Sequence, residues 1–181
     1  MNDNADVLED LGVLHDAIAD TLRKAFGPRL RTVGEYDPVD AGRQTILTPA
    51  ILLEVVEMRP AGRVTGGRTA VEVVWSAHCV LSSATDNVQR EVRNFAARAL
   101  RLVDVSRRWG KGEAVMPAAE LEAFPGMFKP GEKGFESWIV NWRQVVHLGE
   151  AWELPDDGPA REIYLGESPN IGPGGDYERL N

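Results

Sequence analysis

The first stretch of regular hydrophobic spacing lies between residues 7 and 26. Hydrophobic side chains recur there every three or four positions, which is typical of one face of an α-helix. The Gly27-Pro28 pair ends the predicted helix, because glycine relaxes the helix terminus and proline cannot continue a helix. The stripe comprises Val7, Leu8, Leu11, Leu14, Ile18, Leu22 and Phe26.

A second stripe of this spacing predicts another helix after Asp86. Asp86 and Gln89 resemble a capping box, and Gly110 and Gly112 end the helix. The arginines on this helix are typical of a solvated face with ion-pair partners, and less so of a phosphate-binding stripe. They are Arg90, Arg93, Arg98, Arg101 and Arg108, and the hydrophobic stripe is Val88, Val92, Phe95, Ala96, Ala99, Leu102 and Val103.

Alternating or β-branched segments predict strands over residues 50–58, 70–81 and 137–148, with a shorter strand over residues 30–36. The glycine-rich segment between the strands predicted over residues 50–58 and 70–81, with Gly66-Gly67 near its turn, predicts that these two strands form an antiparallel hairpin. These elements predict an α+β fold. Its core is a mixed, mainly antiparallel β-sheet flanked by two main α-helices, and an extended C-terminal arm follows.

Residues 1–154 are expected to form one α+β domain, and residues 155–181 a C-terminal arm. Residues 113–136 are rich in proline and glycine, and only residues 118–124 favour one or two helical turns. The arm is rich in glycine, proline and aspartate, so it lacks a core of its own. It is interpreted as a mobile tail or as a segment that orders against another surface.

The tryptophans divide between core and interface roles. Trp138 and Trp142 share a face of one predicted strand, where core packing is favoured over a subunit contact. Trp75 and Trp109 are expected in or beside the core. Trp152 stands at the start of the arm and is the best candidate for an anchor.

Charge and cysteine usage narrow the function classes. The 28 acidic and 20 basic residues give a net charge of -8, which disfavours a general nucleic-acid binder but suits the wall of a passage for DNA. The single cysteine, Cys79, is expected to be a buried small side chain in a protein of a reducing compartment. The acidic, polar N-terminus does not resemble a secretory signal, and no hydrophobic run is long enough to span a membrane.

No catalytic motif is evident. His15, His78 and His147 are far apart in sequence and lack ligand spacing, although separate elements can still bring them together. The segment from Gly62 to Gly67 lacks the lysine and hydroxyl residue of a phosphate-binding loop and lies between two strands. We therefore expect no catalytic, cofactor-binding or metal-binding residues, no cofactor and no enzymatic activity.

Glu54 interrupts a hydrophobic strand, and its burial is costly without a partner. An arginine within the fold or across a subunit interface is one interpretation. A solvent-facing Glu54 on a half-exposed strand is the other.

The order of these elements resembles that of tail terminators and tail-completion proteins of Mu-like and other long-tailed bacteriophages. The resemblance covers residues 12–154 and rests on segments of the two helices and three strands. The hairpin tip and the C-terminal segment do not follow the family pattern. The segments are HDAIADTLRKAF, TPAILLEVVEM, VEVVWSAHCVL, VQREVRNFAARALRLV and SWIVNWRQVVHLGEAWEL.

The resemblance implies a structural virion protein. It would form a homohexameric ring that caps the head-proximal end of the tail tube and joins it to the head-tail connector. The implied partners are copies of itself, the tail tube protein, the connector or stopper protein, and the sheath protein in a contractile tail. Genomic DNA would only pass through the lumen, and no membrane is involved. Assembly would take place in the cytoplasm of the bacterial host.

Three alternatives remain at this point. They are another neck or head-tail joining protein, a small cytoplasmic α+β enzyme, and a generic cytoplasmic binding module. For the ring, exposed strand edges and the arm are the candidate contact elements, because an arm can add a strand to a neighbouring sheet. The candidate interface residues are Glu54, Arg63, Arg68, Trp152, Ile163, Tyr164 and Leu165.

Overall fold

The chain folds as two compact units, Met1–Ala151 and Trp152–Asn181. The computed structural model describes residues 7–37, 46–64, 66–126, 134–152, 163–166 and 177–180. The second unit contains a two-stranded antiparallel hairpin of β6 (Ile163–Gly166) and β7 (Tyr177–Leu180). This pairing inside the predicted arm was not anticipated from the sequence.

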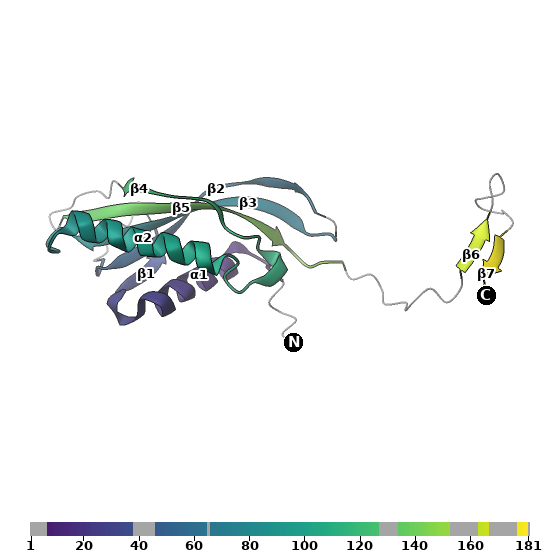
Figure 1. The fold of residues 1–181 in the computed structure, drawn as a ribbon, viewed down its shortest axis with the longest axis horizontal. Coiled ribbons are helices and arrows are strands. Elements are labelled where there is room, and N and C mark those ends of the chain that lie inside the picture. The colour runs from purple at the N-terminus through teal and green to yellow at the C-terminus, as the bar shows by residue number, and fades with distance from the viewer. Residues whose placement is uncertain are drawn as a thin grey trace. The chain divides into compact units, whose positions relative to one another are not determined.

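The first unit has the predicted α+β fold: a mixed five-stranded sheet with two helices (Figure 1). The strand order is β1-β2-β3-β5-β4, in which only β1 and β2 are parallel. The elements are α1 (Leu11–Phe26), η2 (Gly27–Arg29), β1 (Thr32–Glu35), β2 (Ala50–Arg63), β3 (Thr69–Ser82), α2 (Val88–Ser106), η3 (Gly112–Ala114), β4 (Ala119–Gly126) and β5 (Phe135–Leu148).

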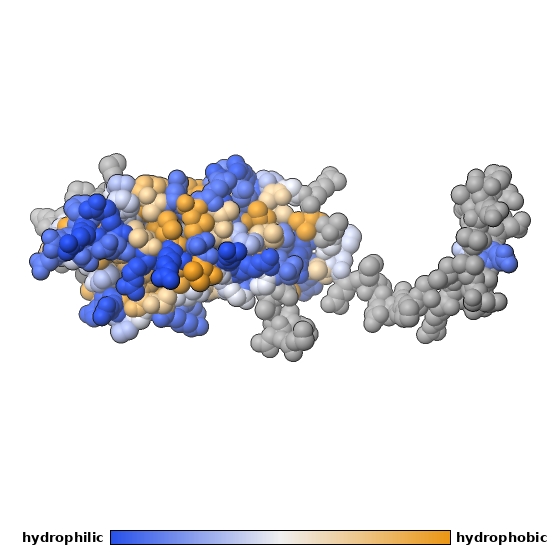
Figure 2. Space-filling view, viewed as in Figure 1, coloured by the Kyte–Doolittle hydropathy of each residue, from blue (hydrophilic) through white to orange (hydrophobic). Residues whose placement is uncertain are grey.

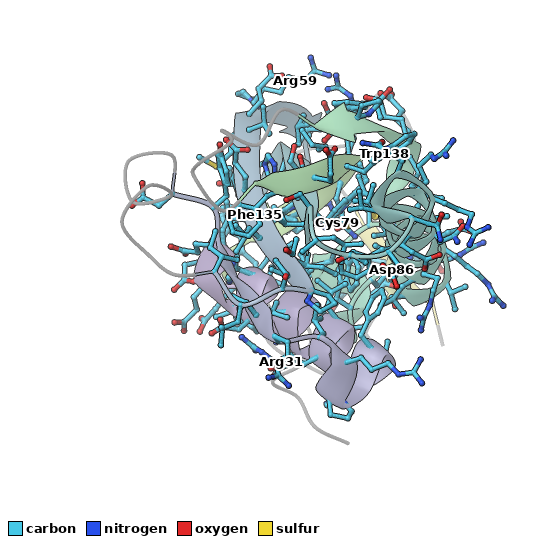
Figure 3. The ribbon with its side chains drawn as sticks, turned by 90° about the vertical axis from the view of Figure 1, so that its left-hand side faces the viewer. Arg31, Arg59, Cys79, Asp86, Phe135 and Trp138 are labelled. Carbon is cyan, nitrogen blue, oxygen red and sulfur yellow. The ribbon has the colours of Figure 1, made fainter. Side chains whose placement is uncertain are left out.

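Both helices cover the same face of the sheet, and the main core lies between the two layers. Alternate residues of β3 and β5 point into this core, since successive side chains of a strand face opposite sides. In the view of Figure 3, Cys79 lies in the middle of the molecule, whereas Arg59 lies at its periphery. The other face of the sheet, which we call the open face, carries in its described part a second, smaller hydrophobic cluster of Ala50, Leu52 and Val80.

The tryptophans lie as predicted. Trp75 and Trp142 are fully buried and stack with ring centroids 6.1 Å apart. Trp109 is buried beside them, and Trp138 packs against the same cluster. The core interpretation of these four side chains is therefore confirmed.

The polar centre of the core is Gln144. Its Oε1 accepts hydrogen bonds from the indole Nε1 atoms of Trp109 (2.9 Å) and Trp142 (3.3 Å). Its Nε2 donates to the carbonyl oxygens of Arg107 (2.6 Å) and Met116 (2.7 Å). The buried amide thus uses both donors and both acceptor positions, so its burial leaves no polar atom unpaired.

The predicted start of the first helix is wrong by four residues. The helix begins at Leu11, because the Asp10 side chain caps it by accepting a hydrogen bond of 3.1 Å from the backbone N–H three residues on. Leu8 is buried outside the helix, where its carbonyl oxygen accepts a hydrogen bond from the N–H of Gly149. Strand-like pairing therefore replaces the first predicted turn.

The predicted capping box at the second helix is also wrong. The N-cap is Asn87, in a left-handed conformation with φ 52° and without a capping hydrogen bond from its side chain. The helix ends at Ser106, four residues before Gly110, because the backbone of Arg107 turns to a positive φ. Neither the start nor the end of α2 therefore lies at the residues that the sequence predicted.

The segment predicted to form helical turns at residues 118–124 is instead the edge strand β4. It pairs with β5, where Phe124 lies opposite Ile139. Pairing with a long neighbouring strand outweighs the local helical preference of these residues. The predicted hairpin tip is shorter than expected, because β2 continues to Arg63 and β3 begins at Thr69. Most of the loop predicted over residues 39–48 lies outside the described residues.

Candidate assembly surfaces

The histidines do not converge on a site. His78 lies on the open face, where its ring stacks on Tyr36 with centroids 4.1 Å apart. His15 lies on α1 near Trp75, and Nδ1 of His147 is 3.2 Å from the carbonyl oxygen of Glu113. Among the described residues, no group of three histidine, cysteine or acidic side chains is arranged to hold a metal ion.

Within the described residues, Glu54 pairs with a histidine and not with the arginine of the first interpretation. Oε2 of Glu54 lies 2.8 Å from Nε2 of His78, and the carboxylate is half-buried. The two side chains meet because they are diagonal neighbours on the open face, where Leu52 lies opposite His78. Their contact links β2 to β3.

Cys79 points away from His78, into the core, as the strand alternation predicts. Burial raises the pKa of its thiol to about 12. A thiol of this pKa is protonated at neutral pH and is a poor nucleophile. The predicted role of a buried small side chain is confirmed.

Four charged side chains form a row across the open face, which we call the charge row: Arg59, Glu72, Arg143 and Glu120. Nε of Arg59 donates to Oε1 of Glu72 (2.7 Å), and Nη1 of Arg143 donates to the same oxygen (2.9 Å). Nε of Arg143 lies 2.6 Å from Oε2 of Glu120. The hydrogen bond from Arg59, together with Arg143, lowers the pKa of Glu72. The same contacts, chiefly that with Glu72, raise the pKa of Arg143.

The lowered pKa predicts an acid-dependent contribution of Glu72 to stability. The contribution is present above the ordinary pKa of a glutamate and is lost as the pH falls through the lowered value. We therefore expect Glu72→Gln to melt at a lower temperature than the wild type at neutral pH, with the gap closing at acidic pH. Circular dichroism melts across a pH series measure this. Glu122→Gln, which changes an exposed carboxylate on β4, should melt at the same temperature as the wild type throughout the pH series. A difference in melting temperature between Glu72→Gln and the wild type that does not change with pH would contradict the assignment.

One edge of the sheet is unpaired over a long stretch. β1 pairs only with residues Ala50 to Leu53 of β2. From Glu54 to Arg63, β2 pairs on one side only among the described residues, with β3. Val56 and Met58 on this stretch are 55% and 59% exposed. We call residues 54–63 the free edge; a strand of this kind can accept a further strand.

The opposite edge of the sheet is protected. β4 carries Glu120 and Glu122, and Pro125 lacks a backbone N–H. Charged residues and proline on an edge strand disfavour pairing with another strand. The free edge also carries Pro60, Glu57 and Arg59, so the two edges differ in the greater exposure of the hydrophobic side chains Val56 and Met58 on β2.

The remaining candidate interface residues belong to both units of the chain. Arg68 lies beside the hairpin tip, and its buried Nε has no hydrogen-bond partner among the described residues. Trp152 is 80% exposed, and Tyr164 of β6 is also exposed. The backbones of Arg63, Ile163 and Leu165 belong to strands, but their side chains lie outside the described residues.

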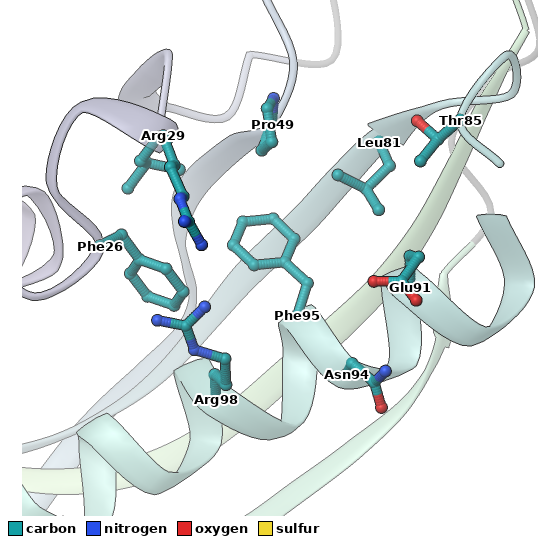
Figure 4. Close-up of a pocket in the computed structure, with 10 residues that line it drawn as sticks. Phe26, Arg29, Pro49, Leu81, Thr85, Glu91, Asn94, Phe95 and Arg98 are labelled. Atoms are coloured by element: carbon teal, nitrogen blue, oxygen red, sulfur yellow. The ribbon is translucent and has the colours of Figure 1, made fainter. Parts of the chain in front are cut away.

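A pocket that the sequence did not predict lies between the end of α1, the end of β3 and α2 (Figure 4). We call it the Arg29/Arg98 pocket. Its volume is about 340 Å³. The guanidinium of Arg98 lies over the ring of Phe26, 4.9 Å from its centroid. The principal lining residues are Phe26, Arg29, Leu30, Leu81, Phe95 and Arg98.

Hydrophobic residues reach the surface between hydrophilic ones on the face seen in Figure 2. No helix within the described ranges is long and apolar enough to cross a membrane. No protein-family model matches the sequence. No curated protein is significantly similar to it.

Proposed function

We propose that the chain is a structural virion protein of a long-tailed bacteriophage, a tail terminator that forms a hexameric ring at the head-proximal end of the tail tube. The observation that carries the proposal is the free edge of β2, which leaves a row of backbone hydrogen-bonding groups and exposed hydrophobic side chains for another chain. A ring needs contacts of this kind, in which one surface of a subunit joins a different surface of the next.

Two further features support an assembly role. The polar side chains of the open face are engaged with one another, in the contact of Glu54 with His78 and in the charge row. The Arg29/Arg98 pocket contains no histidine, cysteine, serine or lysine among its lining residues. Thr85 and Glu91 also line it, but within the described residues no hydrogen bond joins this hydroxyl to this carboxylate, as a nucleophile activated by a base needs. These features favour assembly over the alternative of a small α+β enzyme.

The placement of the chain in the particle tests the proposal. Immunogold labelling of purified tails should place the chain at the head-proximal end of the tube, and quantitative mass spectrometry should give six copies per tail. A neck or head-tail joining protein would instead remain with filled heads when tails are absent. Absence of the label from that end of the tail would overturn the terminator assignment.

Removal of residues 155–181 should separate folding from assembly. The first unit has its own core, so the truncated chain should keep the helix and strand signal of the full chain in circular dichroism. Its incorporation into tails should fall, because an isolated two-stranded hairpin is marginally stable and gains stability by docking on another surface. Loss of the folded signal on truncation, or normal incorporation, would contradict this prediction.

A further inference from the structure

The Arg29/Arg98 pocket combines a hydrophobic floor with two cationic groups and one carboxylate, that of Glu91, which lies 3.6 Å from Nε of Arg90. The rings of Phe26 and Phe95 meet edge to face, with centroids 5.3 Å apart. Arg29 and Arg98 extend over this aromatic pair from two different elements (Figure 4). Among the described residues, neither guanidinium is engaged by a carboxylate. Such a pocket suits an aromatic side chain that is flanked by carboxylates.

The chain itself contains a segment of this chemistry at residues 150–157, EAWELPDD, which we call the Trp152 segment. It carries four acidic side chains and no basic one. Trp152 is 80% exposed, and Glu150 is exposed as well. Exposure of a whole indole ring is unfavourable, and tryptophan is the residue type most enriched at the energetic centres of interfaces. The segment is therefore complementary to the pocket in both charge and hydrophobicity.

The length of chain after β5 is too short for Trp152 to reach the pocket of its own copy. Leu81 in the pocket lies opposite Glu136, near the start of β5, whereas the Trp152 segment follows the other end of β5 at Leu148. The intervening strand is about 40 Å long at roughly 3.3 Å per residue. Trp152 lies four residues after Leu148, so even a fully extended chain carries it only about 14 Å.

We propose that the Arg29/Arg98 pocket of one copy binds the Trp152 segment of a second copy. Trp152 packs on the rings of Phe26 and Phe95, and the neighbouring carboxylates face Arg29 and Arg98. Because the two surfaces differ, the contact is head-to-tail, and its repetition by rotation closes a ring. The inference rests on the proposed function, because the contact would be one of those that hold the ring together. The binding itself can be measured with the purified protein, without the virus particle.

Complementation between two defective variants tests the head-to-tail contact. Trp152→Ala removes the aromatic group but keeps the pocket, and the double variant Arg29→Glu, Arg98→Glu inverts the pocket but keeps Trp152. Sedimentation velocity at high protein concentration should show self-association of the wild type and only monomers of each variant. A 1:1 mixture should form heterodimers and no larger species, because one intact contact remains.

The controls separate this contact from general electrostatic effects. Arg101→Glu changes an exposed arginine of α2 outside the pocket and should associate as the wild type does. A labelled peptide of residues 148–158 should bind the full-length Trp152→Ala protein saturably. The same peptide with alanine at position 152 should bind at least tenfold more weakly.

Three outcomes would overturn the proposal. These are equal binding of the two peptides, unchanged self-association of Trp152→Ala, and a mixture that remains monomeric although both variants are folded by circular dichroism. Equal binding of the peptides would mean that the pocket recognises negative charge alone. If any of these three results is found while gold labelling still places the chain at the end of the tube, this contact is rejected and the proposed function is kept.

Discussion

Replacement of Gln144 by leucine is expected to lower the free energy of unfolding by on the order of 4 kcal/mol, because buried groups left without a hydrogen-bond partner cost about 1–3 kcal/mol each. The variant would leave three groups unpaired, the indole N–H groups of Trp109 and Trp142 and the carbonyl oxygen of Met116. The carbonyl oxygen of Arg107 would keep its hydrogen bond from the backbone N–H of Ala118. Chemical denaturation followed by tryptophan fluorescence measures the loss.

A matched leucine on the same strand provides the control. Asn141 faces the open side and makes one side-chain hydrogen bond, from Ser76 at 2.7 Å, in a half-buried position. Asn141→Leu should therefore cost about 1 kcal/mol, the net value of one such bond. Similar losses for the two variants would show that Gln144 is not the polar centre of the core.

The second large effect concerns assembly. The double variant Val56→Lys, Met58→Lys should reduce incorporation into tails at least tenfold, because lysines on an edge strand prevent pairing with another strand. Both side chains are more than half exposed, so the subunit itself should fold normally. Quantitative mass spectrometry of purified tails from a complemented deletion strain, with circular dichroism of the subunit, measures both properties.

Val105→Lys is the matched control for this experiment. Val105 is 68% exposed but lies on α2, away from the free edge. A lysine there adds charge without affecting a strand edge, and incorporation should be unchanged. If the double variant at Val56 and Met58 is incorporated as well as the wild type, the free edge is not an assembly contact, and the proposed function loses its main support.

The sequence predicted those elements whose signal is local. Strand alternation placed Trp138 and Trp142 on the same, core-facing side of β5, and helical spacing placed Leu14 and Val103 in the core. These predictions are confirmed because side-chain periodicity depends only on neighbouring residues. The α+β class follows from the same patterns.

The features that were missed depend on residues far apart in the chain. β4 is a strand because β5 offers it a pairing edge. The alternation from Ala119 to Ala123 was a strand signal, but alanine, leucine and glutamate also favour a helix. The partners of Gln144 lie 28 to 37 residues away, apart from Trp142. The Arg29/Arg98 pocket joins three elements, and no local pattern marks such a convergence. The contact of Glu54 with His78 likewise depends on the register of β2 and β3.

The long central ladder determines how the subunit bears mechanical load. β3 and β5 pair without a register shift from Thr69 opposite Leu148 to Ser82 opposite Phe135. A pull transmitted from the pocket end to the Trp152 end runs parallel to these strands and perpendicular to their hydrogen bonds. The bonds are then strained in shear and yield together, not one after another as in unzipping. Tension passed from copy to copy would therefore be resisted along the stiffest direction of the sheet.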